Sequence, residues 1–103
     1  PLDSWEHMSG VERKIITEDD IAFGYIVYDN NGKIWSLEVK PEYKGQGYGK
    51  MMLKHYLNTT YHDVYTLTPI TEELIDFYKR FGFEETDEYE DHLAEFPIME
   101  LVL

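Results

Sequence analysis

The chain has 103 residues, no cysteine and a formal net charge of −12. This length predicts one domain, and the lack of cysteine excludes disulfides, thiolate nucleophiles and cysteine-bound zinc. The acidic balance argues against a nucleic-acid partner, which needs a basic face, and favours cationic substrates or basic protein partners.

The first seven residues are expected to lie outside the fold. They show no periodicity, and His7-Met8 resembles a cloning junction ahead of a natural start. We therefore expect residues 1–7 to be a cloning remnant and residues 8–103 to form one domain. The sequence has no signal-peptide pattern and no apolar run of the roughly 18 residues that a membrane span needs, which predicts a cytoplasmic protein without membrane contact.

Two strands joined by a tight turn are the first predicted elements. Residues 21–28 are rich in β-branched and aromatic side chains, and residues 33–40 form the return strand, which ends at Pro41. Between them, Asp29-Asn30-Asn31-Gly32 tolerates the positive φ of a hairpin turn. Strict alternation would place the return strand's side chains on two faces: Trp35, Leu37 and Val39 on one, and Ile34, Ser36 and Glu38 on the other.

A glycine-rich stretch, Lys44-Gly45-Gln46-Gly47-Tyr48-Gly49, follows this hairpin and precedes a predicted helix at 51–57. We call residues 44–49 the glycine loop. Its glycines allow positive φ and close approach to a ligand. Its backbone N–H groups and those of the helix N-terminus could bind phosphate or pyrophosphate, although a flexible turn is the alternative reading. The spacing is neither that of a P-loop nor that of a dinucleotide-binding Rossmann motif.

The remaining elements complete an α/β pattern. A third strand is predicted at 64–68, and Thr71 is placed to cap a second helix that runs to about residue 81. Gly82 ends that helix, and strands follow at 83–84 and 97–103. This order predicts an α/β domain with a central mixed sheet and two main helices.

Two motifs in this pattern resemble a known family. Residues 37–49 are similar to the central motif of the GNAT superfamily of acyl-CoA-dependent N-acetyltransferases, and residues 74–83 are similar to its later helix motif. The resemblance covers about residues 21–103 and implies a truncated GNAT fold, without the usual opening strand and two helices before Ile21. A homodimer partner or a large acceptor would then cover the sheet face left open.

The resemblance also implies acetyl-CoA as co-substrate and a set of binding groups. Backbone groups of Leu37 and Val39 would hold the pantetheine arm, and the Val39 N–H would polarise the thioester carbonyl. The pyrophosphate would be bound by the main-chain N–H groups of the glycine loop, with an added charge from Lys50. These loop residues are Lys44, Gly45, Gln46, Gly47, Tyr48 and Gly49.

Two side chains are candidates for proton transfer. Tyr78 matches the family tyrosine that can protonate the leaving thiolate, although simple core packing is the alternative for this position. Glu38 is a candidate general base, directly or through water, although a polar strand residue is commonly just solvent-facing. The sequence has Lys33, Trp35 and Thr66 where some members carry bases, and Lys44 where Arg or Gln is usual.

Other charged groups give weaker signals. His55 and His62 are too isolated in the sequence to predict a metal site. Seven acids lie within residues 84–95, which we call the acidic loop. This loop is either a solvated segment or a docking surface for a basic partner.

The sequence therefore predicts an N-acetyltransferase that acts on the amine of a cationic acceptor, a protein lysine or N-terminus. The main alternative is a catalytically inactive GNAT scaffold that binds a basic partner through its acidic face. A coenzyme A sensor is a third reading.

Overall fold

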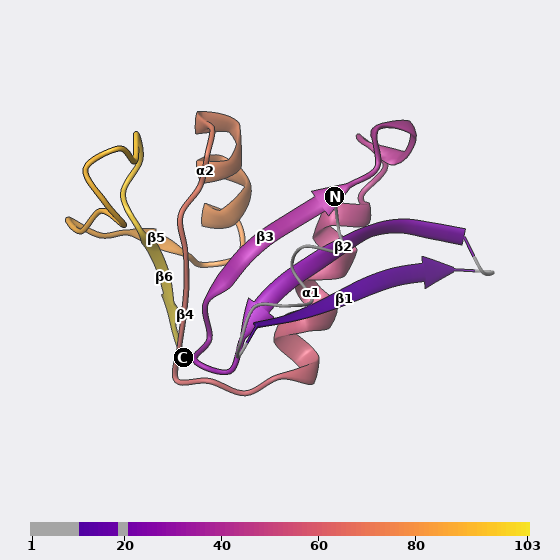
Figure 1. The fold of residues 1–103 in the computed structure, drawn as a ribbon, viewed down its shortest axis with the longest axis horizontal. Coiled ribbons are helices and arrows are strands. Elements are labelled where there is room, and N and C mark those ends of the chain that lie inside the picture. Colours follow the sequence, from indigo (N-terminus) through magenta and orange to yellow (C-terminus); the bar gives the residue numbers. More distant parts are fainter. Residues whose placement is uncertain (1–10, 19–20) are drawn as a thin grey trace. The chain divides into compact units, whose positions relative to one another are not determined.

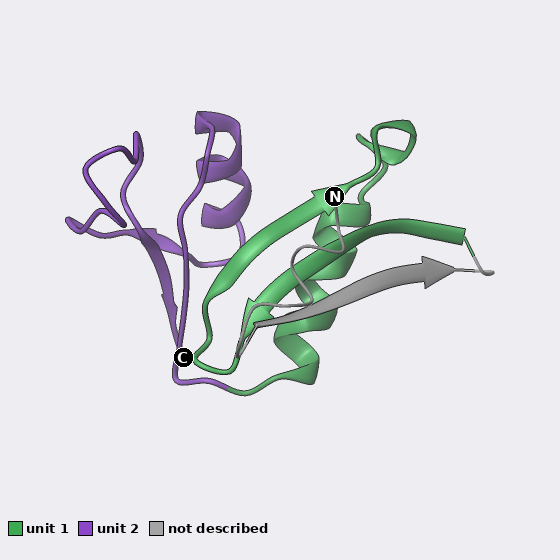
Figure 2. Cartoon of the chain, in the orientation of Figure 1, with its two compact units in different colours: residues 1–61 green, residues 62–103 purple. Residues whose placement is uncertain are grey.

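The computed structural model describes the backbone of residues 11–18 and 21–103 and the side chains from residue 21 onward (Figure 1). The expected boundary after residue 7 lies outside this part. The chain divides into two compact units, one up to Tyr61 and one from His62 (Figure 2). In the part that the structure describes, no helix is both long and apolar enough to cross a membrane.

The first unit is an antiparallel sheet with one helix. Its elements are β1 (Val11–Glu18), β2 (Ile21–Asp29), β3 (Ile34–Val39), the 3-10 turn η2 (Pro41–Tyr43) and α1 (Tyr48–Thr59). The sheet order is β1-β2-β3, and α1 contacts β2 and β3. This unit buries large apolar or aromatic side chains: Phe23, Ile26, Val27, Ile34, Met52, Leu53 and Tyr56. Ile26 and Val27 are successive residues of β2 and so lie on opposite faces of the sheet.

The strand β1 corrects the expectation that no strand precedes Ile21. Its sequence, VERKIITE, carries four charged residues and therefore has a weak strand signal of its own. It pairs with β2 along its whole length, from Val11 opposite Asp29 to Glu18 opposite Ile21. This long-range pairing decides its structure, and local propensity does not.

A β-bulge in β3 corrects the predicted faces of that strand. Ser36 pairs with Val27 and Ile34 pairs with Tyr28, so Trp35 is an extra residue between two consecutive partners. The bulge turns Ile34 to the face that carries Leu37, where Ile34 is buried, and leaves the Trp35 side chain 40% exposed. The predicted grouping of Trp35 with Leu37 is therefore wrong.

The second unit contains β4 (Val64–Leu67), α2 (Glu72–Lys79), β5 (Glu84–Glu85) and β6 (Met99–Val102). Its sheet has the antiparallel order β4-β6-β5. The Thr71 hydroxyl accepts a hydrogen bond from the Leu74 N–H at 3.2 Å, which confirms the predicted cap of α2. Gly82 follows the helix with φ 98°, as expected for a residue that ends it. Two main helices in an α/β fold are thereby confirmed.

The hairpin between β2 and β3 is held by one carboxylate. Asp29 Oδ1 accepts hydrogen bonds from the N–H groups of Asn31 and Lys33 at 2.8 and 3.2 Å, and Oδ2 accepts one from Trp35 Nε1 at 3.0 Å. Burial raises the pKa of Asp29, but these three bonds and the Lys33 charge together hold it below its ordinary value of 3.8. The Lys33 ammonium lies 4.0 Å from the centre of the Trp35 ring.

The lowered pKa of Asp29 predicts a pH-dependent contribution to stability. Because the folded state favours the ionised carboxyl, this contribution is present above the unfolded pKa of 3.8 and is lost as the pH falls through the folded pKa. The variant Asp29→Asn should therefore lose part of the fall in unfolding free energy below about pH 4, measured by urea unfolding from pH 7 to pH 3.

The control variant is Asp87→Asn, which removes the same charge from an exposed position in the second unit. It corrects for the general repulsion of an acidic chain. Equal pH profiles of the two variants would contradict the role of the Asp29 hydrogen bonds.

Candidate active site

The end of β3 presents backbone groups at an open sheet edge. The Lys40 N–H donates to the Phe23 carbonyl at 2.8 Å. Hydrogen-bonded and non-hydrogen-bonded pairs alternate in an antiparallel ladder, so the next pair, Val39 with Gly24, is a non-hydrogen-bonded one, as is Leu37 with Ile26. The N–H and C=O groups of Leu37 and Val39 therefore point away from β2, toward the edge that β3 forms in its sheet. This orientation is the one predicted for these two residues.

The glycine loop has the backbone geometry of an anion site. Gly45 and Gly47 have φ of 79° and 87°, and an added Cβ at either would meet nothing within 4 Å. Gly47 is the N-cap of α1 and accepts the first helical hydrogen bond, from Met51 N at 3.1 Å. The N–H groups of residues 48–50 precede that bond and have no partner within the helix.

Charge at the glycine loop supports the same reading. Lys44 and Lys50 are both exposed at its two ends. The α1 N-terminus adds a partial positive charge from the aligned peptide dipoles. In a chain with a net charge of −12, this segment has two lysines and no acid over residues 43–51. The loop residues predicted to bind pyrophosphate thus lie together on one exposed turn.

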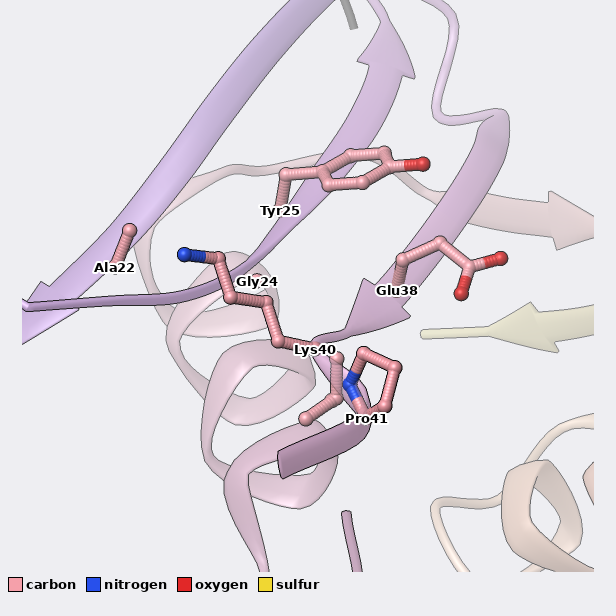
Figure 3. Close-up of a pocket in the computed structure, with 7 residues that line it drawn as sticks. Ala22, Gly24, Tyr25, Glu38, Lys40 and Pro41 are labelled. Carbon is pink, nitrogen blue, oxygen red and sulfur yellow. The ribbon is translucent and has the colours of Figure 1, made fainter. Parts of the chain in front are cut away.

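A pocket of about 350 Å³ lies beside the end of β3 (Figure 3). It opens above Gly24, which has no side chain and could not have one, because a Cβ there would collide with the Glu38 carbonyl. Tyr25 and Glu38 are directly opposite on β2 and β3 and so share a face. Figure 3 shows the Lys40 amine pointing toward Ala22 and away from the Glu38 carboxylate.

The pocket was only partly predicted. Glu38 and Val39 were candidate site residues, and both line it. The other lining residues are Ala22, Gly24, Tyr25, Lys40 and Pro41. A glycine inside a strand marks a close backbone approach, so Gly24 was a signal that the sequence offered.

Tyr78 lies on α2, in the second unit, with its side chain 5% exposed. Its ring contacts Phe77 and Phe83, with centroid distances of 5.2 and 5.7 Å. These contacts fix the ring within the core of that unit. The role of its hydroxyl in protonating a thiolate stays a prediction.

Two of the residues that stand where some GNAT members carry a general base have structural contacts instead. Trp35 and Lys33 belong to the hairpin cluster around Asp29. Among the side chains that the structure describes, from residue 21 onward, no three histidine or acidic groups lie so as to hold a metal ion.

Fold and site together describe an α/β domain in which a glycine loop leads into a helix N-terminus and follows the edge strand of a sheet. The sequence model of the acetyltransferase (GNAT) domain matches residues 9–85. The chain belongs to the GNAT family of acetyltransferases.

Known proteins show the same likeness. The chain is 34% identical over 55 residues to the uncharacterized N-acetyltransferase ycf52 of Gracilaria tenuistipitata var. liui. The aligned segment covers 52% of this chain and 30% of that protein. It is 26% identical over 89 residues to the peptidyl-lysine N-acetyltransferase YjaB of Salmonella typhimurium, 84% of this chain and 61% of that one. The chain thus spans less than two thirds of the length of these relatives.

A solved structure agrees in fold. Arabidopsis thaliana Naa50 in complex with the bisubstrate analogue CoA-Ac-MVNAL aligns with a TM-score of 0.71 and 26% identity, over 88% of this chain and 72% of that one.

Proposed function

We propose that this chain transfers an acetyl group from acetyl-CoA to the amine of a cationic acceptor, a protein lysine or N-terminus. The observation that carries the proposal is the combination of the glycine loop with the outward backbone groups of Leu37 and Val39. A loop of N–H donors suits a pyrophosphate, and a free strand edge suits the amide groups of a pantetheine arm.

The main chain supplies most of the coenzyme binding. The N–H groups of residues 48–50 donate to the pyrophosphate, while Lys44 and Lys50 add positive charge. The pantetheine arm then runs along β3 and pairs with Leu37 and Val39 in the manner of an added strand. The bisubstrate analogue in the Arabidopsis complex contains coenzyme A, which supports this ligand for a domain of the same fold.

The reaction is a direct transfer. The neutral amine of the acceptor attacks the thioester carbonyl carbon, and its oxygen gains negative charge that the Val39 N–H stabilises. The carbon–sulfur bond then breaks, and the attacking nitrogen gives its proton to water. Tyr78 donates a proton to the leaving thiolate, and the product is an amide together with free coenzyme A.

The pocket beside Glu38 suits the acceptor. It combines a carboxylate for an ammonium group with apolar lining from Ala22, Val39 and Pro41 for an aliphatic stem. Two relatives support a peptide amine: the Salmonella protein bears the name of a peptidyl-lysine acetyltransferase, and the Arabidopsis complex holds a peptide-bearing analogue.

The first experiment is isothermal titration of acetyl-CoA, and of desulfo-coenzyme A, into the whole chain. We expect micromolar binding of both, since the glycine loop contacts the part that they share. No binding at millimolar ligand would overturn the proposed function.

The Tyr78→Phe variant tests the proposed acid. We expect kcat to fall about 100-fold, because the leaving thiolate loses its proton donor. The affinity for acetyl-CoA should stay within about twofold, as the ring and its core contacts remain. Unchanged kcat at saturating substrates would remove Tyr78 from the reaction.

The Glu38→Gln variant tests the acceptor pocket. Because Glu38 is exposed and opposite Tyr25, the substitution leaves the fold intact. If the carboxylate binds the acceptor ammonium, the KM for a lysine peptide should rise about tenfold while the Kd of acetyl-CoA is unchanged. A pH–rate profile separates this from a general base, whose loss would instead lower kcat and remove the acidic limb of the profile.

A second candidate function rests on the acidic loop. All seven of its acids are exposed. In the same loop, Tyr89 and Leu93 expose 53% and 78% of their surface. Acidic charge with exposed apolar side chains suits a basic partner protein. For an inactive binding protein, titration would show no coenzyme binding, and charge reversal in residues 84–95 would abolish capture of that partner.

A further inference from the structure

We infer that Phe23, Tyr43 and Tyr48 form an aromatic clamp that holds the glycine loop in its binding conformation before the coenzyme arrives. The inference rests on the proposed function and concerns how the same site is prepared. Phe23 acts here as a positioning residue, since it lies beneath the loop and outside the ligand-binding turn.

The three rings contact one another, and two of them belong to the glycine loop or its entry. Tyr43 is the last residue before the loop, and Tyr48, within the loop, is the first residue of α1. The Phe23 ring stacks on Tyr48 at 4.1 Å between centroids and 16° between planes, and meets Tyr43 edge-on at 5.1 Å. Tyr43 and Tyr48 contact each other at 5.7 Å, also edge-on. Both favoured arrangements of aromatic pairs are therefore present.

Backbone hydrogen bonds tie the same residues together. The Phe23 carbonyl accepts from the Lys40 N–H at 2.8 Å, and the Lys40 carbonyl accepts from the Tyr43 N–H at 2.9 Å. The entry to the loop is thus linked to Phe23 both through its main chain and through its ring. Phe23 itself is 4% exposed and fixed in the central strand of its sheet.

The loop between the rings needs such a constraint. Residues 44–47 are all exposed, and glycine at positions 45 and 47 gives the backbone the greatest conformational freedom. One side-chain bond crosses this turn, from Gln46 Nε2 to the Glu42 carbonyl at 3.3 Å. A loop that samples many conformations without ligand must be ordered on binding. The conformational entropy lost in this step reduces the affinity for the ligand.

The clamp therefore predicts a specific kinetic pattern. Removing a ring should weaken coenzyme binding and raise the KM for acetyl-CoA, while kcat at saturating acetyl-CoA is unchanged. A loss of general fold stability would instead lower the active fraction and so reduce the apparent kcat.

The test compares Tyr43→Leu with Tyr43→Phe in the whole chain. Tyr43 lies outside the glycine loop and is only half-buried, so its replacement is better tolerated than that of Phe23. The matched control is Tyr89→Leu, the same substitution at an exposed position in the second unit. Two quantities are measured: the Kd of coenzyme A by titration, and the amide hydrogen exchange of residues 44–50 without ligand.

We expect Tyr43→Leu to raise the Kd about tenfold, from the loss of its aromatic pairs with Phe23 and Tyr48, and to speed exchange in the loop. Tyr43→Phe keeps the ring and should match the parent within about twofold, as should Tyr89→Leu. Unchanged loop exchange in Tyr43→Leu, or an equal loss in Tyr43→Phe, would overturn the clamp. If the parent chain binds no coenzyme A, the proposed function fails, and the exchange data still decide whether the rings order the loop.

Discussion

The hydrogen bond from the Lys40 N–H to the Phe23 carbonyl is the constraint on which the site depends. It fixes which residues of β3 bond to β2, and so turns the backbone groups of Leu37 and Val39 to the open edge. It is made by the residue that lies between the end of β3 at Val39 and the start of η2 at Pro41. One main-chain bond thus sets the direction of the free backbone groups at the start of the segment that leads into the glycine loop.

The chemistry of the site is largely that of the main chain. The donors at residues 48–50 and the outward groups on β3 are main-chain groups, which every residue except proline carries in full. This explains why lysine at position 44 is compatible with the geometry: the loop conformation comes from Gly45 and Gly47, both at positive φ. The two side chains proposed for proton transfer, Glu38 and Tyr78, lie on separate elements, β3 and α2.

Local patterns predicted the parts of the fold that local interactions determine. The hairpin turn, the cap at Thr71 and the helix-ending Gly82 each need particular residue types, and the sequence shows them. The strand β1 was missed because its charged sequence is a strand only through pairing with β2. The faces of β3 were misassigned because a bulge at Trp35 is set by pairing, which alternation alone does not reveal. The glycine loop was predicted as a binding turn. The contact of its Tyr48 with Phe23 was not predicted, because it joins residues far apart in the sequence.

The bulge at Trp35 has a consequence for errors in folding. If β3 slipped by one residue against β2, the backbone groups of Leu37 and Val39 would turn inward and those of Glu38 would face the edge. Such a molecule would retain a hairpin of nearly the same length yet turn different backbone amides toward the sheet edge. The extra residue and the Asp29–Trp35 hydrogen bond oppose this slip, since both exist in one alignment of the strands. The cluster of Asp29, Lys33 and Trp35 in the hairpin therefore stabilises the register in which β3 pairs with β2.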